Sequence, residues 1–225
     1  MGTLSIVATP IGNLEDITLR ALRTLKETDA IFAEDTRVVS KLLARYEIKK
    51  PLYRLDASKE EKRAEEIIER LGKGENIVYV SDAGTPGISD PGTRLVALVR
   101  AAGFQPIAIP GPSALTAALS IAGVDVTEFV FLGFLPHKKG RQTALKGIAA
   151  EDRAVVLYES PHRILKLLVE LGSVINDRLI VIGRELTKMH EEVISGTAEE
   201  LRARLESAGS ARGEFVVIVA RKDSK

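Results

Sequence analysis

The segment best suited to contact a ligand is residues 81–92, which read SDAGTPGISDPG. It holds three glycines, two prolines and two aspartates. Glycine lets a backbone approach a ligand closely and adopt positive φ angles, and proline stiffens a turn. Connections between a strand and a helix are usually shorter than this, and long ordered loops are often functional. We therefore predict that residues 81–92 form a ligand-binding loop rather than a simple connection.

Regular elements must position this loop. The apolar run at residues 76–80 predicts a buried strand before it, and residues 93–99 predict a helix after it. Strands and helices alternate throughout the first half of the chain, which is typical of a mostly parallel sheet. The strands expected there lie at residues 4–8, 30–33, 76–80 and 104–109, and the helices lie around residues 19–25, 37–46, 64–71, 93–99 and 114–121.

The second half contains a further set of strands and helices. Residues 123–127 mark the expected boundary, so the predicted fold is α/β with two domains, residues 1–124 and 125–225, and a ligand cleft between them. Ligands of open α/β folds bind at the carboxyl ends of the strands. We therefore expect the loops after residues 8, 80, 109, 158 and 183 to face this cleft. The strands expected in the second half lie at residues 129–132, 154–158, 178–183, 192–196 and 215–220.

Several common chemistries are excluded or disfavoured. The chain has no cysteine, which excludes disulfides and thiolate metal sites, and its three histidines are not at metal-ligand spacing, so we expect no metal. The phosphate motif G-x-x-x-x-G-K-S/T, the dinucleotide motif G-x-G-x-x-G and the hydrolase motif G-x-S-x-G are absent. A site lined by backbone, carboxylates and apolar side chains remains, and it suits an amphipathic, zwitterionic ligand with an adenosine end.

Composition restricts the cellular setting. The 225 residues carry a net charge of +1, so no overall field attracts nucleic acid, although a local patch can still do so. Residues 101–124 are uncharged and long enough to span a bilayer, but three prolines and a glycine divide them into a strand, a turn and a helix. The N-terminus lacks the basic region of a signal peptide. We expect a cytoplasmic protein with no membrane partner.

Eight short motifs, each weak by itself, occur in order along nearly the whole chain. They are TPIGNL at residues 9–14, AEDTR at 33–37, SDAGTPGISDPG at 81–92, PGPSA at 110–114, GFLP at 133–136, YESPHR at 158–163, RELTK at 184–188 and GEFVV at 213–217. Together they resemble the tetrapyrrole methylase superfamily and, within it, the ribosomal RNA small subunit methyltransferase I branch. One departure is residues 55–60, LDASKE, where relatives commonly carry a His- and Asn-containing segment.

The resemblance implies an S-adenosylmethionine-dependent methyltransferase that forms a homodimer. It also implies a substrate, the ribose 2′-hydroxyl of a cytidine in small-subunit (16S) ribosomal RNA. The cofactor-binding residues implied by the matching motifs are Pro10, Ile11, Asp82, Gly84, Thr85, Ile88, Ser113, Ala114, Tyr158, Leu186 and Gly213.

Methyl transfer to oxygen is an in-line displacement, in which proximity and orientation contribute about 7–11 kcal/mol. A ribose hydroxyl is a poor nucleophile until its proton is removed or shared. The candidate catalytic bases are Asp35, Glu159 and Glu185, which all lie at the ends of predicted strands. The competing interpretation is that these carboxylates only form ion pairs, with Arg37, Arg163 and Arg184.

The clearest basic cluster is formed by Lys138, Lys139 and Arg141. Such clusters are usually solvated surface, but with an RNA substrate this one is the first candidate for contacts to the phosphate backbone. Arg37 and Arg163 are further candidates for RNA phosphates.

Two other functions remain open. The same donor with a corrin or porphyrin precursor as acceptor would use arginines to bind an acidic macrocycle. A non-catalytic module that binds the ribosome and only retains the fold would not bind the methyl donor.

Overall fold

The computed structural model describes residues 1–55, 60–175, 178–207 and 212–222. Most of the LDASKE segment therefore lies outside the described residues. Contacts between Cα atoms group the chain into two compact units, Met1–Ser113 and Ala114–Lys225. The helix α5 (Ala114–Ser120), which the expected boundary at residue 124 assigns to the first domain, contacts β10 (Phe215–Val219) and belongs to the second unit.

The first unit contains a five-stranded sheet of order β3-β2-β4-β1-β5 in which all pairs are parallel, as the alternation of elements predicted. The edge strand β3, missed by the sequence analysis, has only three residues, too few to show an apolar pattern. The elements are β1 (Leu4–Val7), a 3-10 turn (Leu14–Asp16), α1 (Leu19–Glu27), β2 (Ala30–Ala33), α2 (Thr36–Arg45), β3 (Leu52–Arg54), α3 (Glu60–Gly72), β4 (Ile77–Val80), α4 (Thr93–Ala101) and β5 (Ile107–Ile109).

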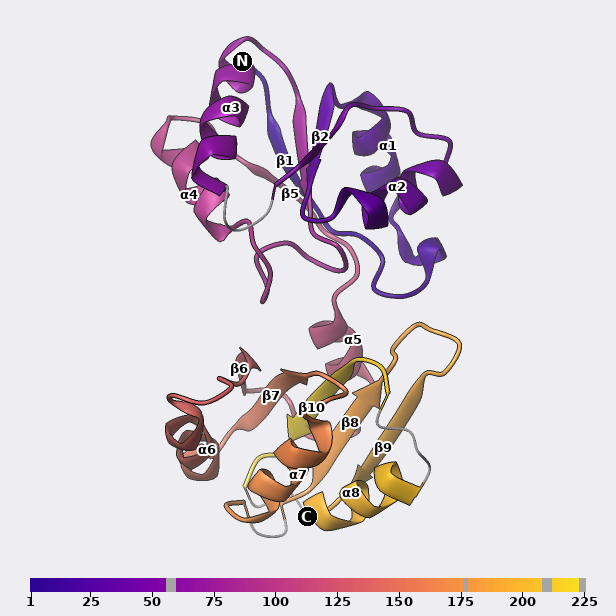
Figure 1. The fold of residues 1–225 in the computed structure, drawn as a ribbon, viewed down its shortest axis with the longest axis vertical. Coiled ribbons are helices and arrows are strands. Elements are labelled where there is room, and N and C mark those ends of the chain that lie inside the picture. Colours follow the sequence, from indigo (N-terminus) through magenta and orange to yellow (C-terminus); the bar gives the residue numbers. More distant parts are fainter. Residues whose placement is uncertain (56–59, 176–177, 208–211, 223–225) are drawn as a thin grey trace. The chain divides into compact units, whose positions relative to one another are not determined.

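Helices cover both faces of this sheet. Figure 1 shows α1 and α2 on one side and α3 and α4 on the other. Alternate residues of a strand point to opposite faces, and in β4 Val78 and Val80 pack with the first pair of helices while Ile77 and Tyr79 pack with the second. Because the register pairs the last residues of β1, β2 and β4, the loops that follow these strands leave the sheet at one edge.

The second unit contains a mixed sheet of order β6-β7-β10-β8-β9. Only β6 and β7 are parallel, and the other pairs are antiparallel. One face packs against α6, α7 and α8. Since β7 and β8 both run opposite to β10, the ends of β7 and β8 and the start of β10 share one edge. The remaining elements are β6 (Phe129–Phe134), α6 (Arg141–Ala150), β7 (Ala154–Glu159), α7 (Ile164–Gly172), β8 (Ile180–Arg184), β9 (Glu192–Gly196) and α8 (Ala198–Ser207).

Local signals set several helix starts. Thr18 accepts a hydrogen bond from the Ala21 amide and caps α1. Ahead of α8, Glu200 accepts from the Thr197 amide at 2.8 Å and Thr197 Oγ1 accepts from the Glu200 amide at 3.3 Å, which is a capping box. Within the described part of the chain, every helix is too short or too polar to cross a membrane.

Candidate active site

Three loops meet at the carboxyl edge of the first sheet. Thr9, just after β1, and Gly84, in the loop after β4, exchange two backbone hydrogen bonds of 2.9 and 3.0 Å. Thr85 Oγ1 donates to the carbonyl of Pro112, in the loop after β5, at 3.2 Å. Distant segments of the sequence are thereby fastened together. The predicted cofactor-binding residues that lie in these loops are Pro10, Ile11, Asp82, Gly84, Thr85, Ile88 and Ser113.

Glycine is required where the loops approach most closely. Gly84 has a φ of +79°, and a Cβ added there would lie 3.3 Å from Cγ2 of Ile11. A Cβ at Gly111 would lie 3.1 Å from Cβ of Ala8. A Cβ at either position would therefore force its neighbours to shift. The edge therefore presents backbone groups together with the apolar side chains of Ile11, which is partly buried, and Ile88, which is exposed.

Two carboxylates at this edge, Asp82 and Asp35, accept hydrogen bonds from backbone amides and so hold the loops in place. Asp82 Oδ1 accepts a hydrogen bond from the backbone amide of Asp35 at 2.8 Å and so joins the loop after β4 to the end of β2. Asp35 caps α2 by accepting from the Arg37 amide, and its carboxylate lies 2.5 Å from the Arg37 guanidinium. Hydrogen bonds from the guanidinium and then from the amide of Arg37 lower the pKa of Asp35 to about 2. Asp35 thus forms the predicted ion pair.

In the second unit, Glu185 lies at the end of β8 against the start of β10. It accepts hydrogen bonds from Lys188 Nζ at 2.8 Å and from the Glu214 amide at 2.9 Å. Burial alone would raise the pKa of Glu185, but these hydrogen bonds and the nearby positive charges outweigh it and hold the pKa below its ordinary value. Gly213 has a φ of +103°, and a Cβ added there would lie 2.5 Å from Cγ of Glu185, so a side chain at this position would displace the Glu185 carboxylate.

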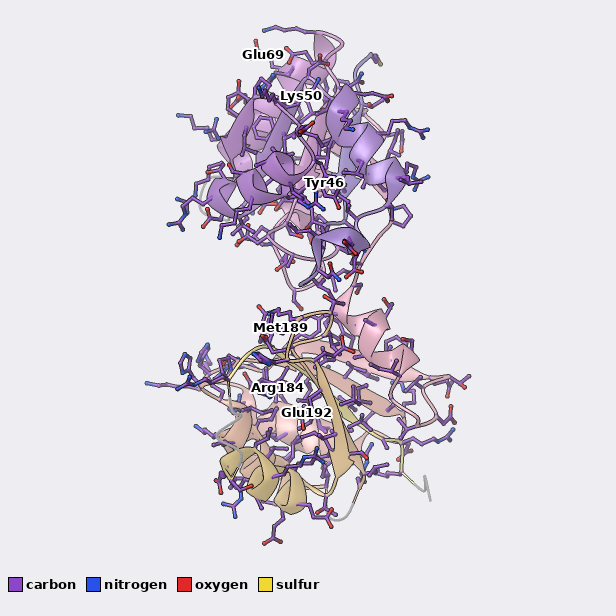
Figure 2. All side chains as sticks on the ribbon, turned by 90° about the vertical axis from the view of Figure 1, so that its right-hand side faces the viewer. Tyr46, Lys50, Glu69, Arg184, Met189 and Glu192 are labelled. Carbon is purple, nitrogen blue, oxygen red and sulfur yellow. The ribbon has the colours of Figure 1, made fainter. Side chains whose placement is uncertain are left out.

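The loop around Glu185 has an unusual backbone. Glu185 and Thr187 have positive φ angles of 50° and 66°, which non-glycine residues adopt at a cost and which are frequent at functional sites. Leu186 between them is buried, and a Cβ at Gly183 would contact its side chain. The predicted pairing of Glu185 with Arg184 is wrong, because this turn directs Glu185 to Lys188. Arg184 instead pairs across strands with Glu192, at 3.4 Å (Figure 2).

Glu159, at the end of β7, is almost fully buried. Its carboxylate lies 2.7 Å from the guanidinium of Arg163, the second predicted ion pair. Arg141 is 4% exposed and pairs with Glu170 at 2.6 Å. Arg163 and Arg141 also donate to the carbonyls of Leu135 and Pro136. This network holds the turn after β6 in place.

The burial of Arg141 contradicts its predicted contact with RNA phosphates. Its side chain, at the first position of α6, pairs with Glu170 and is shielded from solvent, where an RNA phosphate would bind. Arg163 is also largely enclosed by its contacts with Glu159 and Leu135. Of the predicted RNA-binding residues, Lys138, Lys139 and Arg37 have exposed side chains.

Tyr158, the second residue from the end of β7, lies in an aromatic cluster that the sequence analysis did not identify. Its ring packs edge-on against Phe131 and Phe134, with centroids 5.0 and 5.6 Å apart. Its hydroxyl accepts a hydrogen bond from the Leu115 amide at 3.1 Å, at the start of α5 next to Ala114. The available signal was the concentration of three phenylalanines in residues 129–134. Among the described residues, no cluster of His, Asp or Glu could hold a metal ion.

Comparison with known proteins identifies the family. The family model described as Tetrapyrrole (Corrin/Porphyrin) Methylases matches residues 3–202. The chain is 45% identical to the Ribosomal RNA small subunit methyltransferase I of Thermotoga maritima, with 99% of this chain and 100% of the relative covered. The proteins of the same name in Xylella fastidiosa and Escherichia coli O157:H7 are 48% and 46% identical, with 97% of this chain and 81% and 77% of the relatives covered.

Solved structures share the fold at much lower identity. A cobalt precorrin-4 methyltransferase of cobalamin biosynthesis matches with a TM-score of 0.73 and 18% identity, covering 96% of this chain and 94% of that chain. Diphthine synthase matches with a TM-score of 0.76 and 16% identity, covering 98% and 90%. These two matches concern the fold alone. The family model and the relatives show that the chain belongs to the tetrapyrrole (corrin/porphyrin) methylase family, in the branch named ribosomal RNA small subunit methyltransferase I.

Proposed function

We propose that this protein transfers the methyl group of S-adenosylmethionine to the ribose 2′-hydroxyl of a cytidine in small-subunit (16S) ribosomal RNA. The observation that carries the proposal is the identity of 45–48% to relatives named for a small-subunit ribosomal RNA methyltransferase, over 97–99% of this chain. The resemblance of the eight motifs supplies the ribose hydroxyl as the acceptor.

The loops after β1, β4 and β5 in the first unit, which hydrogen bonds join, suit the adenosine end of this donor. Purine rings pack on apolar side chains, which Ile11 and Ile88 provide. The close approach at Gly84 leaves backbone groups as the polar partners that fix the orientation of a ligand. We propose that Pro10, Ile11, Asp82, Gly84, Thr85, Ile88 and Ser113 contact the donor.

Within the second unit, we propose that Ala114, Tyr158, Leu186 and Gly213 contact the donor. Support comes from their placement, since Tyr158, Leu186 and Gly213 lie at the ends of β7 and β8 and just before β10, along one edge of the sheet. S-Adenosylmethionine, when bound, supplies an activated methyl group. The chain's own part is to align the acceptor oxygen, exclude water and accept a proton.

The exposed pair Lys138 and Lys139 is the proposed contact to RNA phosphates, together with Arg37. We further propose that the protein acts in the cytoplasm as a homodimer on the small ribosomal subunit. Light scattering of the purified protein tests the dimer, and a monomeric mass at working concentration would contradict it.

The decisive experiment supplies labelled S-adenosylmethionine and purified small subunits from cells that lack the enzyme. We expect label in the ribosomal RNA. Because a 2′-O-methyl group removes the hydroxyl that attacks the phosphodiester, alkaline hydrolysis should leave the label in an alkali-resistant dinucleotide. Label released as a base-methylated mononucleotide, or transfer to a precorrin and not to the subunit, would contradict the proposal. A melting temperature that does not rise with S-adenosylhomocysteine would favour the non-catalytic module.

A further inference from the structure

Glu34 is a carboxylate at the carboxyl end of β2, outside the proposed donor-binding residues. It follows β2 directly, and because Ala33 pairs with Val80, its backbone lies beside the start of the loop at residues 81–92. Its side chain is partly buried. No hydrogen bond or ion pair among the described residues involves Glu34, which is unusual for a partly buried carboxylate.

The charges around Glu34 are mostly negative. Asp82 and Asp90 come from the loop after β4, Asp35 follows in the chain, and Arg54 of β3 supplies the opposing positive charge. Burial first, and then the charges of Asp82 and Asp90, raise the pKa of Glu34. The buried hydroxyl of Tyr79 has no hydrogen-bond partner in the described part of the chain, and its pKa is raised by burial and next by the charge of Glu34. This environment therefore stabilises the protonated form of Glu34 relative to its charged form.

The three carboxylates expected to act as bases are engaged elsewhere. Asp35 is held by Arg37, Glu159 is buried against Arg163, and Glu185 is held by Lys188. A carboxylate that accepts hydrogen bonds from cations is stabilised in its charged form and is a weak base. Glu34 differs from all three because no described residue donates a hydrogen bond to it or pairs with it.

We propose that Glu34 is the general base that accepts the proton of the acceptor hydroxyl, an inference that rests on the proposed function. A lone pair of the ribose 2′-oxygen forms the new bond to the methyl carbon. The carbon–sulfur bond breaks and leaves its electron pair on sulfur, which becomes a neutral thioether. The hydroxyl proton passes to the carboxylate of Glu34 and then to water. Charge, atoms and electrons balance without a further reactant.

The position of Glu34 agrees with this role. In the sheet order β3-β2-β4-β1-β5, the proposed donor loops follow β4, β1 and β5, and Glu34 follows β2, which neighbours β4. The acceptor hydroxyl would therefore approach from the side of β2. A base whose pKa is raised toward the working pH transfers protons more effectively than an ordinary carboxylate.

The test compares Glu34→Gln with the matched change Glu27→Gln. Glu27 is an exposed carboxylate at the end of α1, just before β2 begins, whereas Glu34 follows the end of β2. Methyl transfer to small subunits should fall about 10²- to 10⁴-fold in Glu34→Gln and stay unchanged in Glu27→Gln. Calorimetric affinity for S-adenosylhomocysteine should be unchanged in both. The melting temperature of Glu34→Gln should equal or exceed that of the wild type, because the substitution removes repulsion from Asp82 and Asp90.

The pH profile adds a second readout. The wild-type rate should rise with pH to a plateau as Glu34 loses its proton, and Glu34→Gln should lack this rise. Glu34→Asp, which keeps a carboxylate on a shorter side chain, should retain the rise at a lower rate. Activity of Glu34→Gln equal to that of Glu27→Gln, or loss of its S-adenosylhomocysteine binding, would overturn the role of Glu34 alone. Wild-type protein that binds S-adenosylhomocysteine but methylates no subunit would overturn the proposed function, and this role with it.

Discussion

The guanidinium of Arg163 lies 2.7 Å from the carboxylate of Glu159, whose side chain is fully excluded from water. The same arginine donates to the carbonyl of Leu135 at 3.1 Å. One ion pair thus joins the end of β7 to the start of α7 and to the turn after β6. Glu159 is therefore placed to stabilise the fold of the second unit.

Replacing Glu159 by alanine should lower the free energy of unfolding by about 3–5 kcal/mol, because it leaves the largely buried guanidinium of Arg163 without a counter-charge. Urea denaturation measures the change. Glu69→Ala, which removes an exposed partner of Lys73, is the control and should leave stability nearly unchanged. Equal stability of the two variants would show that the buried pair contributes little.

Gly84→Ala and Gly74→Ala separate backbone strain from ligand binding. Both glycines have positive φ angles, +79° and +91°, so each alanine should destabilise the fold by about 1–2 kcal/mol. Of the two, only Gly84 lies in the hydrogen-bonded loops after β1, β4 and β5, where an added Cβ would contact Ile11. We expect weaker binding of S-adenosylhomocysteine in Gly84→Ala alone, measured by calorimetry. Equal affinity of both variants would mean that this loop is only a connection.

Glu185→Gln should reduce stability only where Glu185 is ionised. Since contacts in the folded state hold its pKa below the unfolded value, its contribution is fully present above about pH 4.3 and is lost as pH falls through the folded pKa. The wild type should therefore be more stable than the variant at pH 7, and the difference should disappear at strongly acidic pH. Urea denaturation across this range tests the sign, and a difference that persists in acid would contradict it.

Lys138→Ala combined with Lys139→Ala should weaken binding to small subunits and reduce the salt dependence. Each lost phosphate contact lowers the slope of log K against log salt by about 1, so the double variant should lose about 2. The control is Lys166→Ala, on the exposed face of α7. Arg141→Ala should instead destabilise the second unit through its lost contact with Glu170. An unchanged salt slope in the double variant would rule out this contact.

Much of the architecture could be predicted from local patterns. The apolar runs placed β1, β2, β4, β7 and β10 within two residues of their observed positions. The glycine and proline content of residues 81–92 identified the loop whose Gly84 needs a positive φ. These features could be predicted because they depend on the residue itself or its near neighbours. The three-residue strand β3 was missed because its order comes from pairing with β2, a distant segment.

The partners of the charged side chains could be predicted only in part: the pairs Asp35–Arg37 and Glu159–Arg163, close in sequence, were expected, but the other pairs were not. The sequence by itself determined that strands alternate with helices, that glycine-rich loops follow the strands, and that carboxylates and arginines gather at the strand ends. Only the tertiary structure decided that Arg141 turns inward to Glu170, that Glu185 pairs with Lys188 rather than Arg184, and that Glu34 forms no ion pair with any described residue. The reason is physical: an ion pair depends on the distance and burial of two side chains, which long-range packing of the strands sets.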